Sequence, residues 1–178
     1  MTTLRPAIVE DLPALTSLIA ASVRELSVGF YDEAQRESGL RFVFGVDTRL
    51  IADGTYFVFV DAGGTLAACG GWSRRRTLYG GDQAKSGPDD LLDPTSEPAR
   101  IRAFFVHPSF ARRGLARRLF AHCRDAARVD GFTALELMAT LPGIPLYLAL
   151  GFSPVAREDA RLPDGVVLPM LRMRVAVY

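Results

Sequence analysis

The residues whose types and spacing best suit chemistry lie between Phe105 and Ala116, in the order Phe-Val-His-Pro-Ser-Phe-Ala-Arg-Arg-Gly-Leu-Ala. An apolar run ends at the proline, a short basic loop follows, and apolar residues then recur at intervals of three or four. This pattern predicts a strand, a basic turn and a helix. The first turn of a helix leaves backbone N–H groups without partners and carries the positive end of the helix dipole. With Arg112, Arg113 and Gly114 beside it, the turn is typical of a site for pyrophosphate.

The spacing alone does not say which pyrophosphate such a turn would bind. A Walker loop requires Gly-x-x-x-x-Gly-Lys-Ser/Thr and a dinucleotide fingerprint requires three spaced glycines, and this stretch has neither. A basic, solvated helix start is therefore an alternative interpretation of the same residues.

Further motifs follow in a fixed order along the chain. They are Val106-His107-Pro108, Arg112-Arg113-Gly114-Leu115-Ala116, Gly131-Phe132 before an apolar strand, and Ile144-Pro145-Leu146-Tyr147 before Leu150-Gly151-Phe152. The ordered set, over roughly residues 100 to 152, resembles the GNAT superfamily of N-acetyltransferases. In the family's loop pattern, Gln/Arg-x-x-Gly-x-Gly/Ala, Gly114 and Ala116 match, whereas Ala111 stands at the first position.

The expected fold is a single α/β domain over residues 1–178. It resembles the GNAT architecture, a mixed, mostly antiparallel sheet of six or seven strands with helices on both faces. The residue patterns predict strands at 4–9, 56–60, 65–72, 101–106, 134–140, 153–160 and 170–177, and helices at 10–26, 32–44, 114–130 and 144–150. Gly70 and Gly71 within the third strand indicate a bulge or a close approach of backbone.

The resemblance implies an acetyl-CoA-dependent N-acetyltransferase, with acetyl-CoA as co-substrate and an amine of a small molecule or protein as acceptor. It implies that the cofactor is bound by Phe105, Val106, Arg112, Arg113, Gly114, Leu115, Ala116 and Arg117. It also implies that Tyr147 is the general acid, because a phenol with a pKa near 10 is protonated at neutral pH and can reprotonate a thiolate. Ordinary aromatic packing is the alternative role for this tyrosine.

The general base is left open by the sequence. Many family members place a glutamate on the central strand, where this chain reads Arg100-Ile101-Arg102-Ala103. The remaining candidates are Glu97, Asp93, Asp82, and Tyr31 acting through water, and a water relay or no dedicated base also remains open. The missing carboxylate also suggests a second class of function, a non-catalytic module that binds acyl-CoA.

The long loop over residues 73–99 is polar and rich in glycine and proline, and loops of this length are usually either functional or disordered. We expect it to form one wall of the acceptor pocket. Its arginines, Arg74 to Arg76, could bind an acidic group of the acceptor, and its carboxylates, Asp82, Asp89, Asp90, Asp93 and Glu97, could attract an ammonium. A solvated, partly disordered loop is the alternative.

Composition limits the remaining classes of protein. Hydrophobic residues make up 49% of the 178 residues, which is too many for a disordered chain, and no apolar run approaches the roughly 20 residues of a membrane helix. A net charge of +1 gives no bias toward nucleic acid or membrane, so scattered surface charge explains the arginine clusters better than DNA binding.

Cys69 and Cys123 fit two buried thiols without a metal site. We expect a cytoplasmic protein, and the sequence is compatible with a homodimer.

Overall fold

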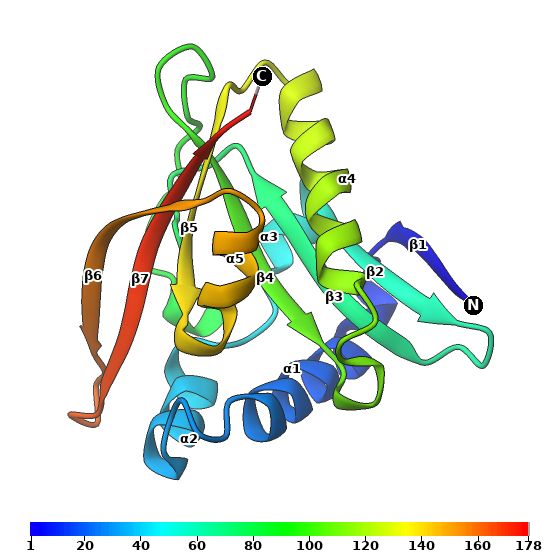
Figure 1. The fold of residues 1–178 in the computed structure, drawn as a ribbon, viewed down its shortest axis with the longest axis vertical. Helices are drawn as coiled ribbons and strands as arrows, with labels where there is room; N and C mark the ends of the chain where they lie inside the picture. The colour runs from blue at the N-terminus through cyan, green and yellow to red at the C-terminus, as the bar shows by residue number, and fades with distance from the viewer. Residues whose placement is uncertain (178) are drawn as a thin grey trace.

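The computed structural model describes residues 1–177, whose strands form one seven-stranded sheet in the order β1-β2-β3-β4-β5-β7-β6 (Figure 1). The strands are β1 (Thr2–Pro6), β2 (Tyr56–Asp61), β3 (Leu66–Ser73), β4 (Ala99–Val106), β5 (Ala134–Thr140), β6 (Ser153–Arg161) and β7 (Val167–Ala176). Among these described strands the pair β4–β5 alone is parallel. The predicted mixed, mostly antiparallel sheet is therefore confirmed.

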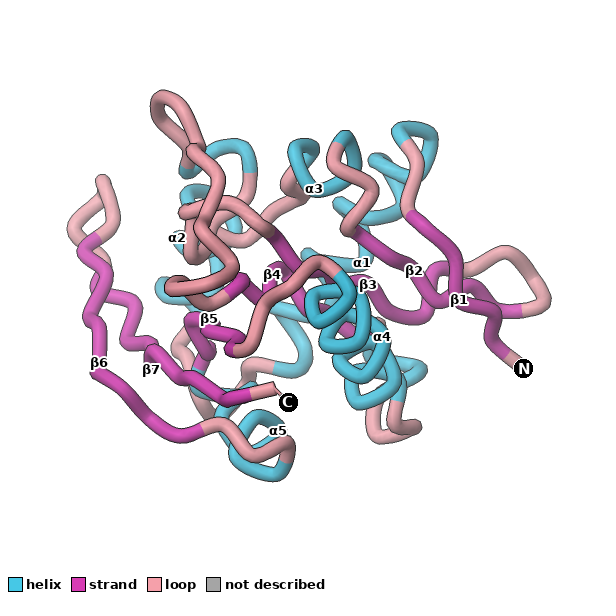
Figure 2. Tube along the Cα trace, turned by 90° about the horizontal axis from the view of Figure 1, so that it is seen from above, coloured by secondary structure: helices cyan, strands magenta, loops and turns pink. Residues whose placement is uncertain are grey.

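Helices cover both faces of the sheet, as expected (Figure 2). They are α1 (Leu12–Leu26), α2 (Glu33–Phe42), α3 (Thr48–Ala52), α4 (Leu115–Val129) and α5 (Ile144–Ala149). α4 and α5 pack against one face, where every fourth residue of α4 is buried at Leu115, Leu119, Cys123 and Ala127. α1, α2 and α3 enclose a second apolar cluster on the opposite face. β3 lies between the two clusters and is buried along its whole length.

Three elements differ notably from the sequence-based prediction, and one of them is β7, which begins at Val167 and not at residue 170. The first strand ends at Pro6, not Val9, because Ile8 and Val9 are exposed and the chain turns into a short 3-10 helix. The helix α3 was not predicted, because five residues are too few to show a helical period. The carboxylate of Asp47 caps this helix by accepting a hydrogen bond from the Arg49 N–H.

The feature that creates space for a ligand is the divergence of β4 from β5. They pair only at Ala99 with Leu135 and at Arg100 with Glu136. Beyond this point β4 is bulged, since Ala103 has a positive φ of 53° and the register against β3 shifts beside it. The hydroxyl of buried Tyr56 donates to the carbonyl of Ala103 at 3.0 Å and holds the bulge in place.

The glycines of β3 allow this bulge, as their positions in the sequence indicated. A Cβ built on Gly70 would lie 2.4 Å from the Phe104 ring, and one on Gly71 would lie 2.4 Å from the Thr55 carbonyl oxygen. No side chain can therefore be placed there without displacing its neighbour. The close approach predicted for this pair of glycines is confirmed.

We expect Gly70→Ala to destabilise the protein by about 1–3 kcal/mol, because the new methyl group overpacks the Phe104 ring. Urea unfolding would measure the loss. The control is Gly63→Ala, whose Cβ would lie 3.4 Å from its nearest neighbour and should change stability by less than about 0.5 kcal/mol. An unchanged unfolding midpoint for Gly70→Ala would show that the bulge does not need a glycine.

Candidate active site

A cavity of about 770 Å³ lies where β4 and β5 diverge, a volume typical of ligand sites. Among the residues singled out from the sequence, its lining includes Phe105, Val106, Arg112, Gly114, Leu115, Ala116, Arg117 and Tyr147. Arg113 does not line this cavity. Its guanidinium lies over the Phe110 ring at 5.2 Å and borders a separate cleft with Asp61 and Arg118.

The basic turn between β4 and α4 forms one end of the cavity. Arg112 and Gly114 both adopt left-handed backbone, with φ of 63° and 76°, and Gly114 is the N-cap of α4. Within residues 1–177, no backbone N–H from Gly114 to Arg117 donates to an acceptor of the protein. A Cβ on Gly114 would meet no protein atom within 4 Å. The turn therefore exposes a row of free donors at the positive end of a 15-residue helix.

The charge of this turn is not neutralised by the protein. In the part of the chain that the structure describes, none of Arg112, Arg113, Arg117 and Arg118 forms an ion pair with a carboxylate. Arg118 instead lies over the Phe59 ring at 4.5 Å. Free donors and uncompensated guanidinium groups together make this end of the cavity suited to a phosphate-bearing ligand.

The middle of the cavity is the gap between the two strands. No residue of β5 pairs with β4 beyond Arg100, so the edge of β4 that faces β5 has backbone groups without a strand partner. Phe104, Phe105 and Val106 of β4 line the gap on one side, and Leu137 of β5 lines it on the other. An extended, partly polar chain could therefore lie here and take the hydrogen bonds of a missing strand.

Tyr147 lies on α5 at the wall of this gap. Its side chain is 8% exposed, and its ring packs edge-to-face against Phe152 at 5.6 Å. Burial raises the pKa of Tyr147 above its ordinary value of 10, and the nearby sulfur of Cys123 adds to the shift. The phenol is therefore protonated across neutral pH, so it can donate a proton but cannot serve as a base there.

The carboxylates considered as bases are all engaged away from the cavity. Asp82 accepts from the Thr48 N–H, Asp93 accepts from Thr95 and Ser96, and Glu97 forms an ion pair with Arg76 at 2.6 Å. Tyr31 is buried, where its hydroxyl donates to the Pro169 carbonyl and accepts from the Leu141 N–H. Among residues 1–177, no aspartate or glutamate lines the cavity.

The expectation for the charged residues of the long loop was wrong. Arg74, Arg75 and Arg76 form ion pairs with Asp130, Asp53 and Glu97, respectively, and Asp89 accepts a hydrogen bond from the Thr77 N–H. None of these residues lines the cavity, and only Leu78 to Gly81 of the loop does so. The loop contributes a wall, but its charges hold the loop to the protein.

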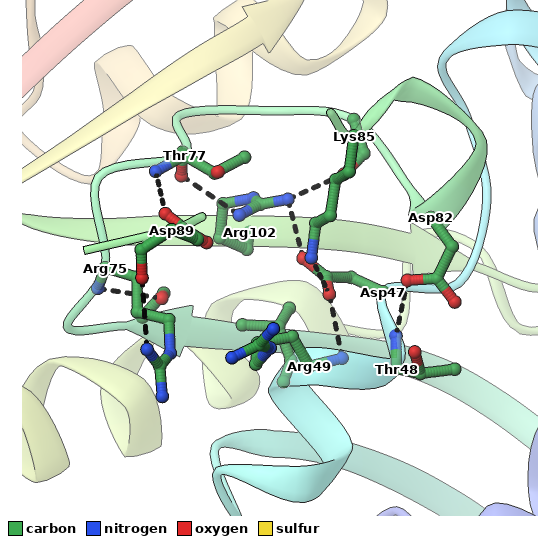
Figure 3. Close-up of polar contacts among 12 residues, drawn as sticks. Asp47, Thr48, Arg49, Arg75, Thr77, Asp82, Lys85, Asp89 and Arg102 are labelled. Carbon is green, nitrogen blue, oxygen red and sulfur yellow. Dashed lines mark hydrogen bonds and ion pairs between the residues drawn. The ribbon is translucent and has the colours of Figure 1, made fainter. Parts of the chain in front are cut away.

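A buried ion pair that sequence reasoning missed anchors this wall (Figure 3). Arg102 of β4 and Asp47, before α3, are 2% and 1% exposed and lie 2.9 Å apart. The Arg102 guanidinium also donates to the carbonyls of Thr77 at 3.0 Å and Gly80 at 2.7 Å, and Lys85 reaches Asp47 from the same loop. Arg102, the one charged residue in the apolar run 101–106, was the signal, because a buried arginine needs a carboxylate partner.

The fold and cavity define a class of α/β protein with free N–H donors at a basic helix start and a gap between two diverging strands. The model of the acetyltransferase (GNAT) family matches residues 19–152. The match covers more than half of the chain, so the chain belongs to the acetyltransferase (GNAT) family. The resemblance identified from the sequence is thereby confirmed.

Solved structures with the same fold include the following three acetyltransferases. A GCN5-related N-acetyltransferase from Rhodopseudomonas palustris has 17% identity over 99% of this chain and 96% of its own, with a TM-score of 0.72. PaiA N-acetyltransferase from Thermoplasma acidophilum, in complex with coenzyme A, has 12% identity, 99% coverage of both chains and a TM-score of 0.65. A phosphinothricin acetyltransferase from Sinorhizobium meliloti, in complex with acetyl-CoA, has 20% identity over 99% of this chain and 88% of its own, with a TM-score of 0.63. No curated protein sequence matched the chain.

No helix within residues 1–177 is both long and apolar enough to cross a bilayer. The same residues contain no group of three or more histidine, cysteine, aspartate or glutamate side chains that could hold a metal ion.

We expect Asp47→Asn to cost about 3–5 kcal/mol of stability, because it leaves the Arg102 guanidinium buried without a carboxylate. Hydrogen exchange should also show faster opening at residues 77–81, which Arg102 holds. The matched control is Asp159→Asn, which removes an exposed pair with Arg157 and should cost less than about 1 kcal/mol. Equal losses for the two variants would contradict the anchoring role of Arg102.

Proposed function

We propose that this protein transfers the acetyl group of acetyl-CoA to a primary amine. Membership of the acetyltransferase (GNAT) family supports the reaction, and structures of two proteins of the same fold hold coenzyme A or acetyl-CoA. The observation that carries the proposal for this chain is the row of free backbone N–H groups from Gly114 to Arg117, set among unpaired arginines at the mouth of the strand gap.

The residues of the basic turn would bind the pyrophosphate of coenzyme A. The N–H groups of Gly114 to Arg117 would donate to the phosphate oxygens, and Arg112 and Arg117 would add charge-assisted hydrogen bonds. The left-handed conformation of Arg112 and Gly114 turns the backbone toward the cavity and keeps these donors together.

The edge of β4 would hold the pantetheine arm and the thioester. Its backbone groups beyond Arg100 lack a strand partner and face the gap, so they are free to hydrogen-bond an extended arm. A backbone N–H in this row that meets the thioester oxygen would stabilise the negative charge that forms during attack. Such a donor is worth about 2.7–4 kcal/mol of transition-state stabilisation.

Tyr147 would act as the general acid that protonates the thiolate of coenzyme A as it leaves. Its raised pKa keeps the phenol protonated at neutral pH, and its place on the wall of the gap is close to where the thioester would lie. The lining within residues 1–177 offers no carboxylate base, so we propose that water removes the ammonium proton before attack, or that the amine binds neutral.

A non-catalytic acyl-CoA-binding module is the second candidate function, and the absence of a lining carboxylate among residues 1–177 is the observation that favours it. Release of free coenzyme A thiol in the presence of a panel of amines separates the two. Turnover with any amine supports the transferase. Tight binding of acetyl-CoA without turnover across the panel would favour the binding module.

We also propose that the protein works in the cytoplasm. Cys69 and Cys123 are both buried and unpaired, which fits a compartment that keeps thiols reduced. Fractionation of the source cells, with detection of the protein by antibody, would test the location.

We expect Gly114→Val to weaken acetyl-CoA binding by about tenfold or more in calorimetry, because the side chain would cover the free N–H groups and strain the turn. Gly165→Val is the matched control. Gly165 has a similar φ of 84° and equally open surroundings but lies in the turn between β6 and β7. Equal affinities for the two variants would place the phosphate site elsewhere.

We expect Tyr147→Phe to keep the affinity for acetyl-CoA and to lower the single-turnover rate of acetyl transfer by about 10²–10⁴-fold, because only the donated proton is lost. The control is Tyr31→Phe, which removes a buried structural hydroxyl outside the cavity. This control should lose stability and keep its rate of chemistry. A normal single-turnover rate for Tyr147→Phe would reduce Tyr147 to a packing residue.

A further inference from the structure

The part of the cavity opposite the basic turn has a distinct chemical character. It lies between α1, the end of α2 and the sheet, and we call it the α1 end of the cavity. Its walls include Val23, Leu26, Phe30, Phe44, Met138 and Met170. These side chains come from α1, the segments that follow α1 and α2, β5 and β7, and they form an apolar surface. A ligand group that enters here leaves water and meets mainly hydrocarbon and aromatic rings.

The polar groups of the α1 end are neutral. They are chiefly the hydroxyls of Ser22, Ser27 and Tyr79. Among the described residues, Arg102 is the one charged residue that lines this end. Its charge is neutralised by the Asp47 carboxylate, which lies 2.9 Å from the guanidinium. The same guanidinium also donates hydrogen bonds to the carbonyls of Thr77 and Gly80, so few of its N–H groups are left for a ligand. Outside the lining, Glu158 lies near Tyr79 and forms an ion pair with Arg172 at 3.8 Å.

The two ends of the cavity therefore select for different chemistry. The basic turn presents free cations for phosphate, whereas the α1 end presents no carboxylate within residues 1–177 and a single, already paired cation. A second ammonium or a carboxylate on the acceptor would lose its hydration there and gain no partner, which is unfavourable. An apolar body would gain from the same burial.

We propose that the acceptor is a small primary amine whose remaining body is apolar and uncharged, of the alkyl or arylalkyl class. This inference rests on the proposed acetyl transfer and specifies its substrate. It excludes polyamines, amino acids and peptide N-termini as preferred acceptors, because each carries further charge or several unpaired polar groups into the α1 end.

The titratable groups of the lining give the proposal a second consequence. Burial raises the pKa of Tyr79 and, to about 12, that of the Cys69 thiol, and it also raises the pKa of Tyr147. The remaining titratable groups of the lining are the arginines, which stay charged. From about pH 6 to pH 9, log kcat/KM should therefore rise with a slope near one, because only the neutral fraction of the amine reacts.

The test measures release of coenzyme A thiol with matched pairs of amines. Hexylamine is compared with 1,6-diaminohexane, and 2-phenylethylamine is compared with phenylalanine and with a tetrapeptide of free N-terminus. We expect kcat/KM for hexylamine to be at least about tenfold higher than for 1,6-diaminohexane. We expect the same advantage for 2-phenylethylamine over phenylalanine and over the tetrapeptide. Preference for the diamine, the amino acid or the peptide would overturn the proposal and leave acetyl transfer standing. No turnover with any amine, despite tight acetyl-CoA binding, would instead defeat the proposed function.

A variant locates the selectivity in the α1 end. Ser22 of α1 is buried at this wall, so Ser22→Asp places a carboxylate there, and Ser22→Asn is the nearly isosteric neutral control. We expect the aspartate to lower the hexylamine-to-diaminohexane ratio of kcat/KM about tenfold and the asparagine to leave that ratio unchanged. Met138→Glu, with Met138→Gln as its control, repeats the test from β5 if the first variant does not fold. Unchanged ratios in the folded aspartate or glutamate variants would show that the acceptor binds elsewhere.

Discussion

The site depends on a single constraint, the inability of β4 to pair with both of its neighbours along its whole length. β4 follows β3 around a bulge at Ala103, and its parallel pairing with β5 ends after Arg100. The backbone edge exposed by this divergence would be unfavourable in a closed core, because buried N–H and C=O groups need partners. In this fold the edge lines a cavity, so a ligand or water can satisfy it. The Gly70 backbone, which leaves room for the Phe104 ring, makes the bulge sterically possible.

The Arg102–Asp47 ion pair sets the other boundary of the cavity. A buried pair of this kind adds little net stability compared with apolar packing, but removal of one partner is costly. Here its geometry connects β4 to the segment before α3 and to the carbonyls of Thr77 and Gly80. The same interaction holds the loop wall in place and neutralises the one charge at the α1 end among the residues described. The position of the loop and the neutrality of the α1 end thus have a common cause.

Much of the fold and of the basic turn could be predicted from the sequence. Period-two and period-3.6 patterns reflect contacts between residues close in the chain, and they predicted β5, α1 and α4 almost to the residue. The turn was recognisable because its arginines, its glycine and the first residues of the predicted helix, whose N–H groups lack helical partners, are adjacent in the sequence. By contrast, Ile8 and Val9 looked like strand residues although they lie exposed beyond the sheet, because local composition does not reveal burial.

By itself, then, the sequence determined the order of the elements, the family resemblance and the place of the basic helix start, all of which depend on residues near one another. Only the tertiary structure decided which charges face the cavity. Asp82 and Glu97 of the long loop read as candidate bases, yet one accepts from a backbone N–H and the other pairs with an arginine, each more than 20 residues away in the sequence. Arg102 is buried within β4, and its carboxylate partner, Asp47, lies 55 residues away in the sequence. Such pairings are fixed by how distant segments pack, and no local pattern encodes them.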